Sequence, residues 1–200
     1  MRLRIVLSAL VVSCLLPAAL HAQDFGVMES AETIDRGNFK FKVNPIVVFG
    51  GEFGDDEPGV VGMVGYGVTS YFDLEGGVAI YDGVTMFGGN AEVWLVRNAP
   101  VDVSAIGGLH FHRGDNTPDI TGVDLTLLAS GHATPRFELY GALDVAFESF
   151  DDNGSFRTVH FVPGVEVRLS EDVDFVAEVG LGINDEARHY ISGGLAFYLR

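Results

Sequence analysis

The sequence has one cysteine and few basic residues. Cys14 lies in a leader-like N-terminal stretch, so a chain cleaved after that stretch has no disulfide, no thiolate nucleophile and no cysteine-ligated metal site. Only 12 lysines and arginines stand against 28 aspartates and glutamates, which gives a formal charge of −16. Nucleic-acid binding needs a basic surface, so the composition excludes that class of function.

The first 22 residues have the three parts of a secretory signal peptide. Two arginines form a short positive region, residues 5–20 form an apolar run, and Leu20-His21-Ala22 offers a small-residue cleavage site. The stretch around Cys14 also resembles a lipoprotein lipobox, but the apolar run continues past it, which suits a signal peptide better. We therefore expect export and cleavage after residue 22, leaving 178 residues with a formal charge of −18.

No stretch after the leader approaches 18 consecutive apolar residues, so the sequence predicts no membrane-spanning helix. Hydrophobic residues nevertheless make up 48% of the chain, and they alternate with polar ones. In residues 136–148, for example, Arg136, Glu138, Asp144 and Glu148 fall on one face and apolar side chains on the other. Alternation with a period of two is typical of β-strands that have one apolar and one polar face.

Ten segments have this character, and most have the roughly 9–11 residues that a tilted strand needs to cross a bilayer. The connections between them are alternately brief and longer, and a similar phrase follows each brief turn, which indicates a repeated hairpin. Short turns at one end and longer loops at the other are typical of outer-membrane barrels, whose short turns face the periplasm. The predicted strands are 38–50, 59–68, 71–81, 84–96, 101–113, 120–132, 136–149, 155–169, 173–183 and 188–199.

The main alternative is a soluble sandwich or barrel with an apolar interior. Against it, the polar face carries many small residues and few charges, and phenylalanines of the apolar face gather near the strand ends, as in the aromatic girdles of membrane barrels. Pro45 and Pro163 fall inside predicted strands, where we expect bulges or strand ends because proline removes a ladder hydrogen bond. Eight strands plus an outer hairpin therefore remain as a second possibility.

The last predicted strand carries a recognisable pattern: a polar residue, a glycine two positions later, and two hydrophobic residues near the end. Ser192, Gly194, Phe197 and Leu199 fill these positions, although Arg200 follows where an aromatic residue commonly ends the chain. The chain resembles the small outer-membrane β-barrel proteins of Gram-negative-type bacteria, which include OmpA-like and porin-like barrels. It shares with them the leader, the repeated hairpins, the excess of acidic residues and this pattern in the last strand. The resemblance implies recognition by the barrel assembly machinery and contact with lipid and lipopolysaccharide; it names no activity.

The sequence thus predicts an all-β, antiparallel up-and-down barrel of about ten strands at residues 38–200, preceded by a periplasmic segment at 23–37. Charges of both signs should point into the lumen near the short turns, as a paired network that either fills the lumen or lines a narrow constriction. Its members are Lys40, Lys42, Asp73, Glu75, Asp102, Arg136, Glu138, Arg168, Asp174 and Glu178. At the other end we expect an acidic mouth that includes Glu52, Asp55, Asp56, Glu57, Asp115, Asp119, Asp151 and Asp152.

Residues that carry chemistry occur only as fragments. His110 and His112 share one strand face at a spacing that a metal can use, with Asp115 as a speculative third ligand; without a dependable third ligand, two exposed or packed histidines are the simpler interpretation. An enzyme would draw on Asp151, Asp152, Ser155 or His160, yet nothing in their spacing singles them out. We therefore expect neither a catalytic site nor a cofactor.

Three functions remain, in order of preference. The first is a non-enzymatic outer-membrane protein, either a narrow passive channel that prefers cations or a plugged structural barrel. The second is a surface protein whose acidic loops bind divalent ions, lipopolysaccharide or a host surface. The third is an outer-membrane enzyme. The permeant, the ligand and the oligomeric state are open at this point.

Overall fold

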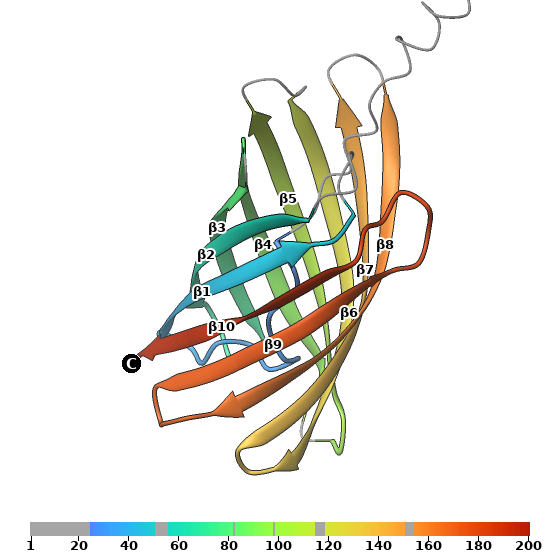
Figure 1. The fold of residues 1–200 in the computed structure, drawn as a ribbon. Helices are drawn as coiled ribbons and strands as arrows, with labels where there is room; N and C mark the ends of the chain where they lie inside the picture. The colour runs from blue at the N-terminus through green and yellow to red at the C-terminus, as the bar shows by residue number, and fades with distance from the viewer. Residues whose placement is uncertain (1–24, 51–55, 82, 98, 115–118, 151–153) are drawn as a thin grey trace, which may run out of the picture.

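The protein is a closed barrel of ten antiparallel strands (Figure 1). The computed structural model describes residues 25–50, 56–81, 83–97, 99–114, 119–150 and 154–200. The strands are β1 (Phe39–Val48), β2 (Glu57–Gly67), β3 (Phe72–Tyr81), β4 (Val84–Val96), β5 (Asp102–Gly114), β6 (Ile120–Thr134), β7 (Phe137–Phe150), β8 (Ser155–Arg168), β9 (Val173–Gly182) and β10 (Tyr190–Leu199). Every predicted strand is present with ends within two residues of the expectation, so the fold class is confirmed and the eight-stranded alternative is wrong.

The alternation in the sequence places polar side chains inside and apolar ones outside. Along β7, Glu138, Tyr140, Asp144 and Glu148 are buried, whereas Leu139, Leu143 and Phe147 are about half exposed. The other strands repeat this pattern, with more than thirty large apolar side chains exposed over the described surface. So extensive an apolar exterior is unfavourable in water and matches a lipid-facing surface. Among the described residues, no helix is both long and apolar enough to cross a membrane.

The barrel wall is taller on one side than on the other. Strands β4 to β8 have 13 to 15 residues, while the remaining strands have 10 or 11. One end of the barrel carries connections of two to five residues, and the other carries connections of two to eight, the longest between β1 and β2. Figure 1 shows the taller hairpins of β5 to β8 rising at the end with the longer loops.

The two strand prolines interrupt the ladders without changing the register. In the seam between β1 and β10, Val43 faces Leu195 and Ile46 faces Ser192, so the pairing resumes in register on both sides of Pro45. The β8–β9 ladder is interrupted in the same way around Pro163. The expected bulges and strand ends do not form there, because each proline faces its other neighbour, on β2 or β7, with unbroken pairing. Register shifts occur instead near the short turns, after Trp94 and after His132.

Several inward-facing aromatic rings each lie over a glycine on the neighbouring strand. Tyr140 faces Gly164 and Tyr190 faces Gly180 as directly paired residues. A Cβ atom at either glycine would overlap the tyrosine ring. The glycines therefore allow a large ring to lie flat along the inner wall. The ring covers the backbone of the glycine, which has no side chain of its own, and this contact fixes the orientation of the ring.

This arrangement predicts the effect of adding one methyl group to the inner wall. Gly164→Ala should destabilise the barrel by about 1–3 kcal/mol, the usual cost of overpacking a filled interior. Gly62→Ala is the matched control, because a Cβ at Gly62 meets no atom within 4 Å. Equilibrium urea unfolding in lipid vesicles, followed through the single tryptophan, measures both variants. Equal stability of the two would contradict the role assigned to Gly164.

Candidate functional site

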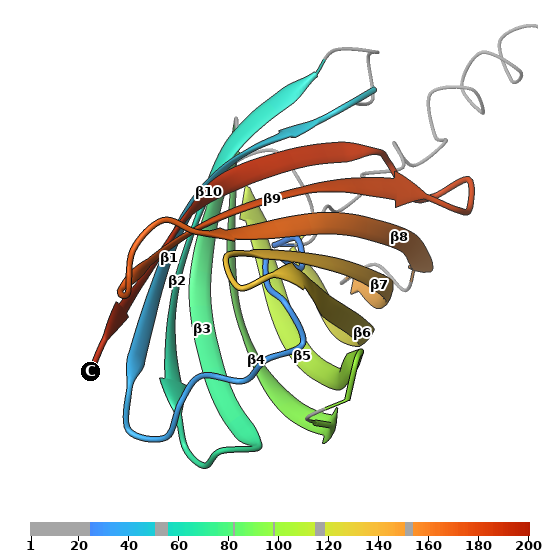
Figure 2. The same ribbon diagram turned by 90° about the horizontal axis from the view of Figure 1, so that it is seen from below.

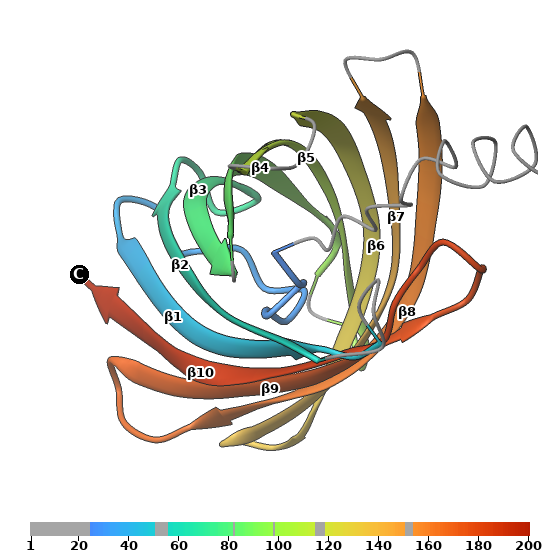
Figure 3. The ribbon, with the colours of Figure 1, turned by 45° about the horizontal axis from the view of Figure 1, so that its top comes forward.

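The chain before β1 lies inside the barrel. Figures 2 and 3 show the blue segment that leads into β1 crossing the interior of the ring of strands. We call residues 25–37 the plug segment. Most side chains in its middle are buried: Val27, Met28, Glu29, Ser30, Ala31, Thr33 and Ile34. The sequence predicts an N-terminal periplasmic segment at residues 23–37, whereas the described part of this stretch, residues 25–37, enters the lumen.

One carboxylate on β9 holds the start of the plug segment. Glu178, only 3% exposed, accepts hydrogen bonds from the backbone N–H groups of Val27 at 3.0 Å and Met28 at 2.6 Å. It also accepts the hydroxyl groups of Tyr140 at 2.8 Å and Tyr190 at 3.0 Å. Four donors thus converge on a single buried side chain, which is the arrangement that makes a buried carboxylate tolerable.

A compact ion cluster holds the next residue of the plug segment. Glu29 Oε2 lies 3.0 Å from the Nζ atoms of both Lys40 and Lys42 on β1. Glu75 on β3 contacts the same two ammonium groups from the wall, at 3.1 and 2.6 Å. Two positive and two negative charges therefore balance within this cluster, so that each of its four buried charges has partners of opposite sign.

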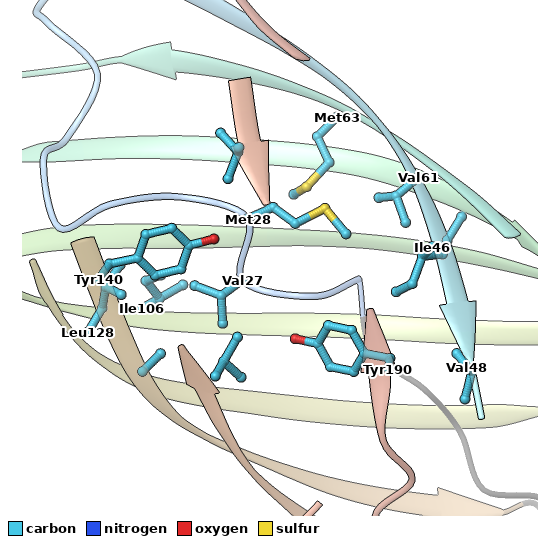
Figure 4. Packing of buried hydrophobic residues seen from close by; sticks show 14 of the residues in the cluster. Val27, Met28, Ile46, Val48, Val61, Met63, Ile106, Leu128, Tyr140 and Tyr190 are labelled. Carbon is cyan, nitrogen blue, oxygen red and sulfur yellow. The ribbon is translucent and has the colours of Figure 1, made fainter. Parts of the chain in front are cut away.

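Further contacts fix the rest of the plug segment. The backbone N–H of Ala31 donates to Ser130 Oγ at 3.0 Å, and that of Ile34 donates to Asp73 Oδ2 at 2.7 Å. The Val27 and Met28 side chains pack among apolar residues of the inner wall, as Figure 4 shows. Backbone groups and side chains of the plug segment are thus matched by groups on β1, β3, β6, β7, β9 and β10.

The structure places most of the expected lumen charges inside, with two exceptions. Lys40, Lys42, Asp73, Glu75, Asp102, Glu138, Asp174 and Glu178 are all buried. Arg136 is exposed, because it lies in the turn before β7 rather than on the strand. Arg168 is also exposed, at the last position of β8, where its Nε atom lies 4.0 Å from Asp174. The inner wall is therefore more acidic than the sequence analysis expected.

A polar cavity of about 500 Å³ lies between the plug segment and the short-turn end of the barrel. Its lining combines residues of the plug segment with strand ends, including Glu32, Lys40, Arg97, Asp174 and Arg200. Burial raises the pKa of the Glu32 carboxyl above its ordinary value, although the His132 ring, 3.8 Å away, acts in the opposite direction. The cavity is a vestibule that ends at the plug segment.

Only part of the expected acidic mouth can be placed. Glu52, Asp55, Asp115, Asp151 and Asp152 lie outside the described residues. Asp56 and Asp119 are exposed, and Glu57 is half-buried. Glu57 forms an ion pair with Arg188 at 2.7 Å, and Asp119 lies 3.7 Å from Arg113. In the described part of the mouth, two of the three acidic residues thus have a cationic neighbour.

The histidines of β5 both point into the barrel. His110 is fully buried and His112 is 5% exposed, and both lie near the carboxylate of Glu148 on β7, whose Oε1 atom is 3.0 and 3.7 Å from their Nε2 atoms. Asp115, the third ligand considered from the sequence, lies outside the described residues. Of the residues considered for an enzyme, Ser155 is exposed at the start of β8, while His160 is buried with its Nε2 atom 2.9 Å from the Arg188 carbonyl oxygen.

Solved structures with a similar arrangement of strands are outer-membrane or designed transmembrane barrels. A bacterial polysaccharide outer-membrane secretin aligns with a TM-score of 0.50 and 10% identity over 72% of this chain, which spans 57% of that structure. The KdgM porin aligns with a TM-score of 0.46 and 10% identity, over 82% of this chain and 99% of its own. OprG from Pseudomonas aeruginosa gives 0.41 and 15% identity, over 86% and 100%.

The chain has the fold of a small outer-membrane β-barrel. No protein-family model and no curated protein matches its sequence. At these identities the likeness concerns the fold alone. The apolar exterior of the barrel matches a surface that faces lipid. The pattern of Ser192, Gly194, Phe197 and Leu199 lies on β10, where Phe197 and Leu199 face outward and Ser192 is buried.

Sequence reasoning missed the plug segment and several acidic residues of the lumen. Glu29 stands in a stretch without strand alternation, so no pattern assigned it to the interior. Glu92 and Asp124 occupy inward positions on β4 and β6. The alternation of those strands is the signal that identifies them, once the inward face is known. Glu148, which the sequence analysis grouped with the polar face of its segment, lies beside the two histidines.

The ion cluster yields a prediction about the stability of the plugged barrel. Glu29→Ala leaves Lys40 and Lys42 with Glu75 as their remaining close carboxylate, so we expect a loss of about 3–5 kcal/mol in the free energy of unfolding. Asp35→Ala removes the same charge from an exposed position of the plug segment and should change stability little. Urea unfolding midpoints compare the two, and similar midpoints would show that the ion cluster does not secure the segment.

Proposed function

We propose that this protein is a non-enzymatic outer-membrane barrel whose lumen is closed by its own N-terminal segment. The observation that carries the proposal is the set of directed contacts to the plug segment, above all the two hydrogen bonds that Glu178 accepts from the backbone N–H groups of Val27 and Met28. A segment that merely drifted into the lumen would not have its backbone N–H groups matched by buried acceptors. Of the two versions of the preferred function, this favours the plugged structural barrel over the open channel.

The strand number explains why a closing segment is needed. Eight strands leave an interior that side chains alone can fill, and the diameter grows with each added strand. Ten strands therefore leave extra room, which the plug segment occupies with both apolar and polar groups. The resulting protein crosses the membrane as a stable support for its loops, after export by the N-terminal signal and insertion by the assembly machinery.

The charge of the inner wall determines what the lumen would pass if the plug segment were absent. Nine buried carboxyl side chains on the strands face two buried lysines. The acids are Asp73, Glu75, Glu92, Asp102, Glu138, Asp144, Glu148, Asp174 and Glu178, and the lysines are Lys40 and Lys42. A confined surface of one sign concentrates the opposite ions, so an opened lumen should prefer cations.

Single-channel recording tests the proposal. The mature protein, refolded in detergent and inserted into a planar bilayer, should show little conductance, whereas a variant that lacks residues 25–34 should show discrete, cation-selective steps. The mobility shift of folded barrels on unheated gels verifies that both proteins are folded. Equal conductance of the two proteins would refute the closing role of the plug segment.

A peptide supplies the matched control for the deletion. The synthetic peptide of residues 25–34, added to the deleted barrel, should reduce its conductance, because the Glu178 and lysine contacts are then available again. A peptide of the same composition in scrambled order should have no such effect. Equal block by both peptides would mean that the lumen accepts any short chain and that the contacts described here are not selective.

A further inference from the structure

His110, His112 and Glu148 form a compact group inside the taller side of the barrel, independent of the plug segment. One ring nitrogen from each histidine and one carboxylate oxygen lie within 4.8 Å of one another. The Nε2 atoms of His110 and His112 lie 3.0 and 3.7 Å from Glu148 Oε1. Ligands at about 2.0–2.1 Å from a tetrahedral zinc ion are roughly 3.3 Å apart, so these spacings suit a metal.

The strand register brings the three residues together. His110 and His112 are two positions apart on β5, so both point inward. Gly122 on β6 is paired with His110 on one side and with Glu148 on the other. A Cβ atom at Gly122 would overlap the His110 ring. The glycine thus lets the ring reach across β6 to the carboxylate on β7.

Asp124 orients the first histidine. Its Oδ2 atom lies 2.7 Å from His110 Nδ1, and a carboxylate in this position accepts the Nδ1–H group. The Nε2 atom of His110 is thereby directed toward Glu148 as the ligand atom. A histidine that donates its other ring N–H to a carboxylate is the usual arrangement at protein metal sites, where it fixes the ring and raises its basicity.

Two buried atoms of the group form no hydrogen bond with any residue that the structure describes. Glu148 is 2% exposed, and its Oε2 atom has no hydrogen bond within the described residues; the same is true of the Nε2 atom of His112. Buried polar atoms are normally satisfied, and an ion between these side chains would satisfy both. Asp124, which contacts His110, also lines a small interior cavity next to Phe25 and Val27.

We propose that His110, His112 and Glu148 bind one divalent transition-metal ion, with Asp124 as the supporting carboxylate. Two imidazoles and one carboxylate with a fourth position for water are a ligand set that suits Zn²⁺. The bound ion links β5 to β7 across β6, near the loop end of the tallest strands.

Zinc titration of the mature protein, refolded in detergent without a polyhistidine tag, tests the proposal against a competing chromogenic chelator. We expect one tight Zn²⁺ per barrel, and at least a hundredfold weaker binding in the double variant His110→Ala/His112→Ala. Asp124→Asn should weaken binding about 10- to 100-fold, as loss of a supporting carboxylate does at other metal sites. Native-like binding by the double variant would overturn the proposal.

A second histidine–carboxylate group provides the internal control. Glu32, His132 and Glu138 also bring three ligand atoms together, but His132 is exposed at the short-turn end. His132→Ala should leave the zinc affinity unchanged. Loss of binding in this variant would show that zinc binds at the His132 group and would refute the site at His110, His112 and Glu148. Should the double variant not refold, X-ray absorption of the zinc-loaded native protein decides. Two imidazole ligands among four support the site, and coordination by oxygen alone refutes it.

Discussion

The structure depends on closing the sheet between its first and last strands. In hydrocarbon no water is available to satisfy a free strand edge, so every backbone donor and acceptor of the wall needs a partner. The β1–β10 pairing supplies it, and it survives Pro45 because the register is the same on both sides of the gap. Ser192 helps there, since its hydroxyl donates to the Pro45 carbonyl oxygen at 2.9 Å. Ser192, one of the four residues of the pattern in the last strand, is thus also part of the seam.

Closure with ten strands creates an interior that the wall must fill or leave open. Glycines on the inner wall leave space for large rings on the neighbouring strand. Tyr140 and Tyr190 lie over Gly164 and Gly180 in this way. The two tyrosine hydroxyls meet at Glu178, whose remaining capacity is taken by the plug segment. The same glycine device at Gly122 brings His110 to Glu148. One structural principle therefore serves both the plug and the histidine group.

The sequence predicts the wall far better than its contents. Alternation with a period of two is a local property, so it identifies ten strands and assigns Lys40, Glu75 and Glu178 to the inner face. The prediction is wrong for Arg136 and Arg168 because Arg136 lies in a turn and Arg168 is the last residue of its strand. At such positions alternation no longer determines whether a side chain points into the barrel. The plug segment could not be predicted, because its position depends on acceptors contributed by strands up to 151 residues away in the chain. Glu148 joins His110 through a register that only the three paired strands define.

The plug segment immediately precedes β1, and it is surrounded by strands on all sides. Its ion pairs are to Lys40 and Lys42 on β1, and Glu178 on β9 accepts two of its backbone N–H groups, so these contacts lie at and beside the closing seam. A chain enclosed in this way cannot enter sideways after the ring has closed. It must either be in position when β1 meets β10 or be threaded in through one end. Topology therefore leaves two orders of assembly: the last pairing is made around the plug segment, or the segment follows through an open end of the finished ring.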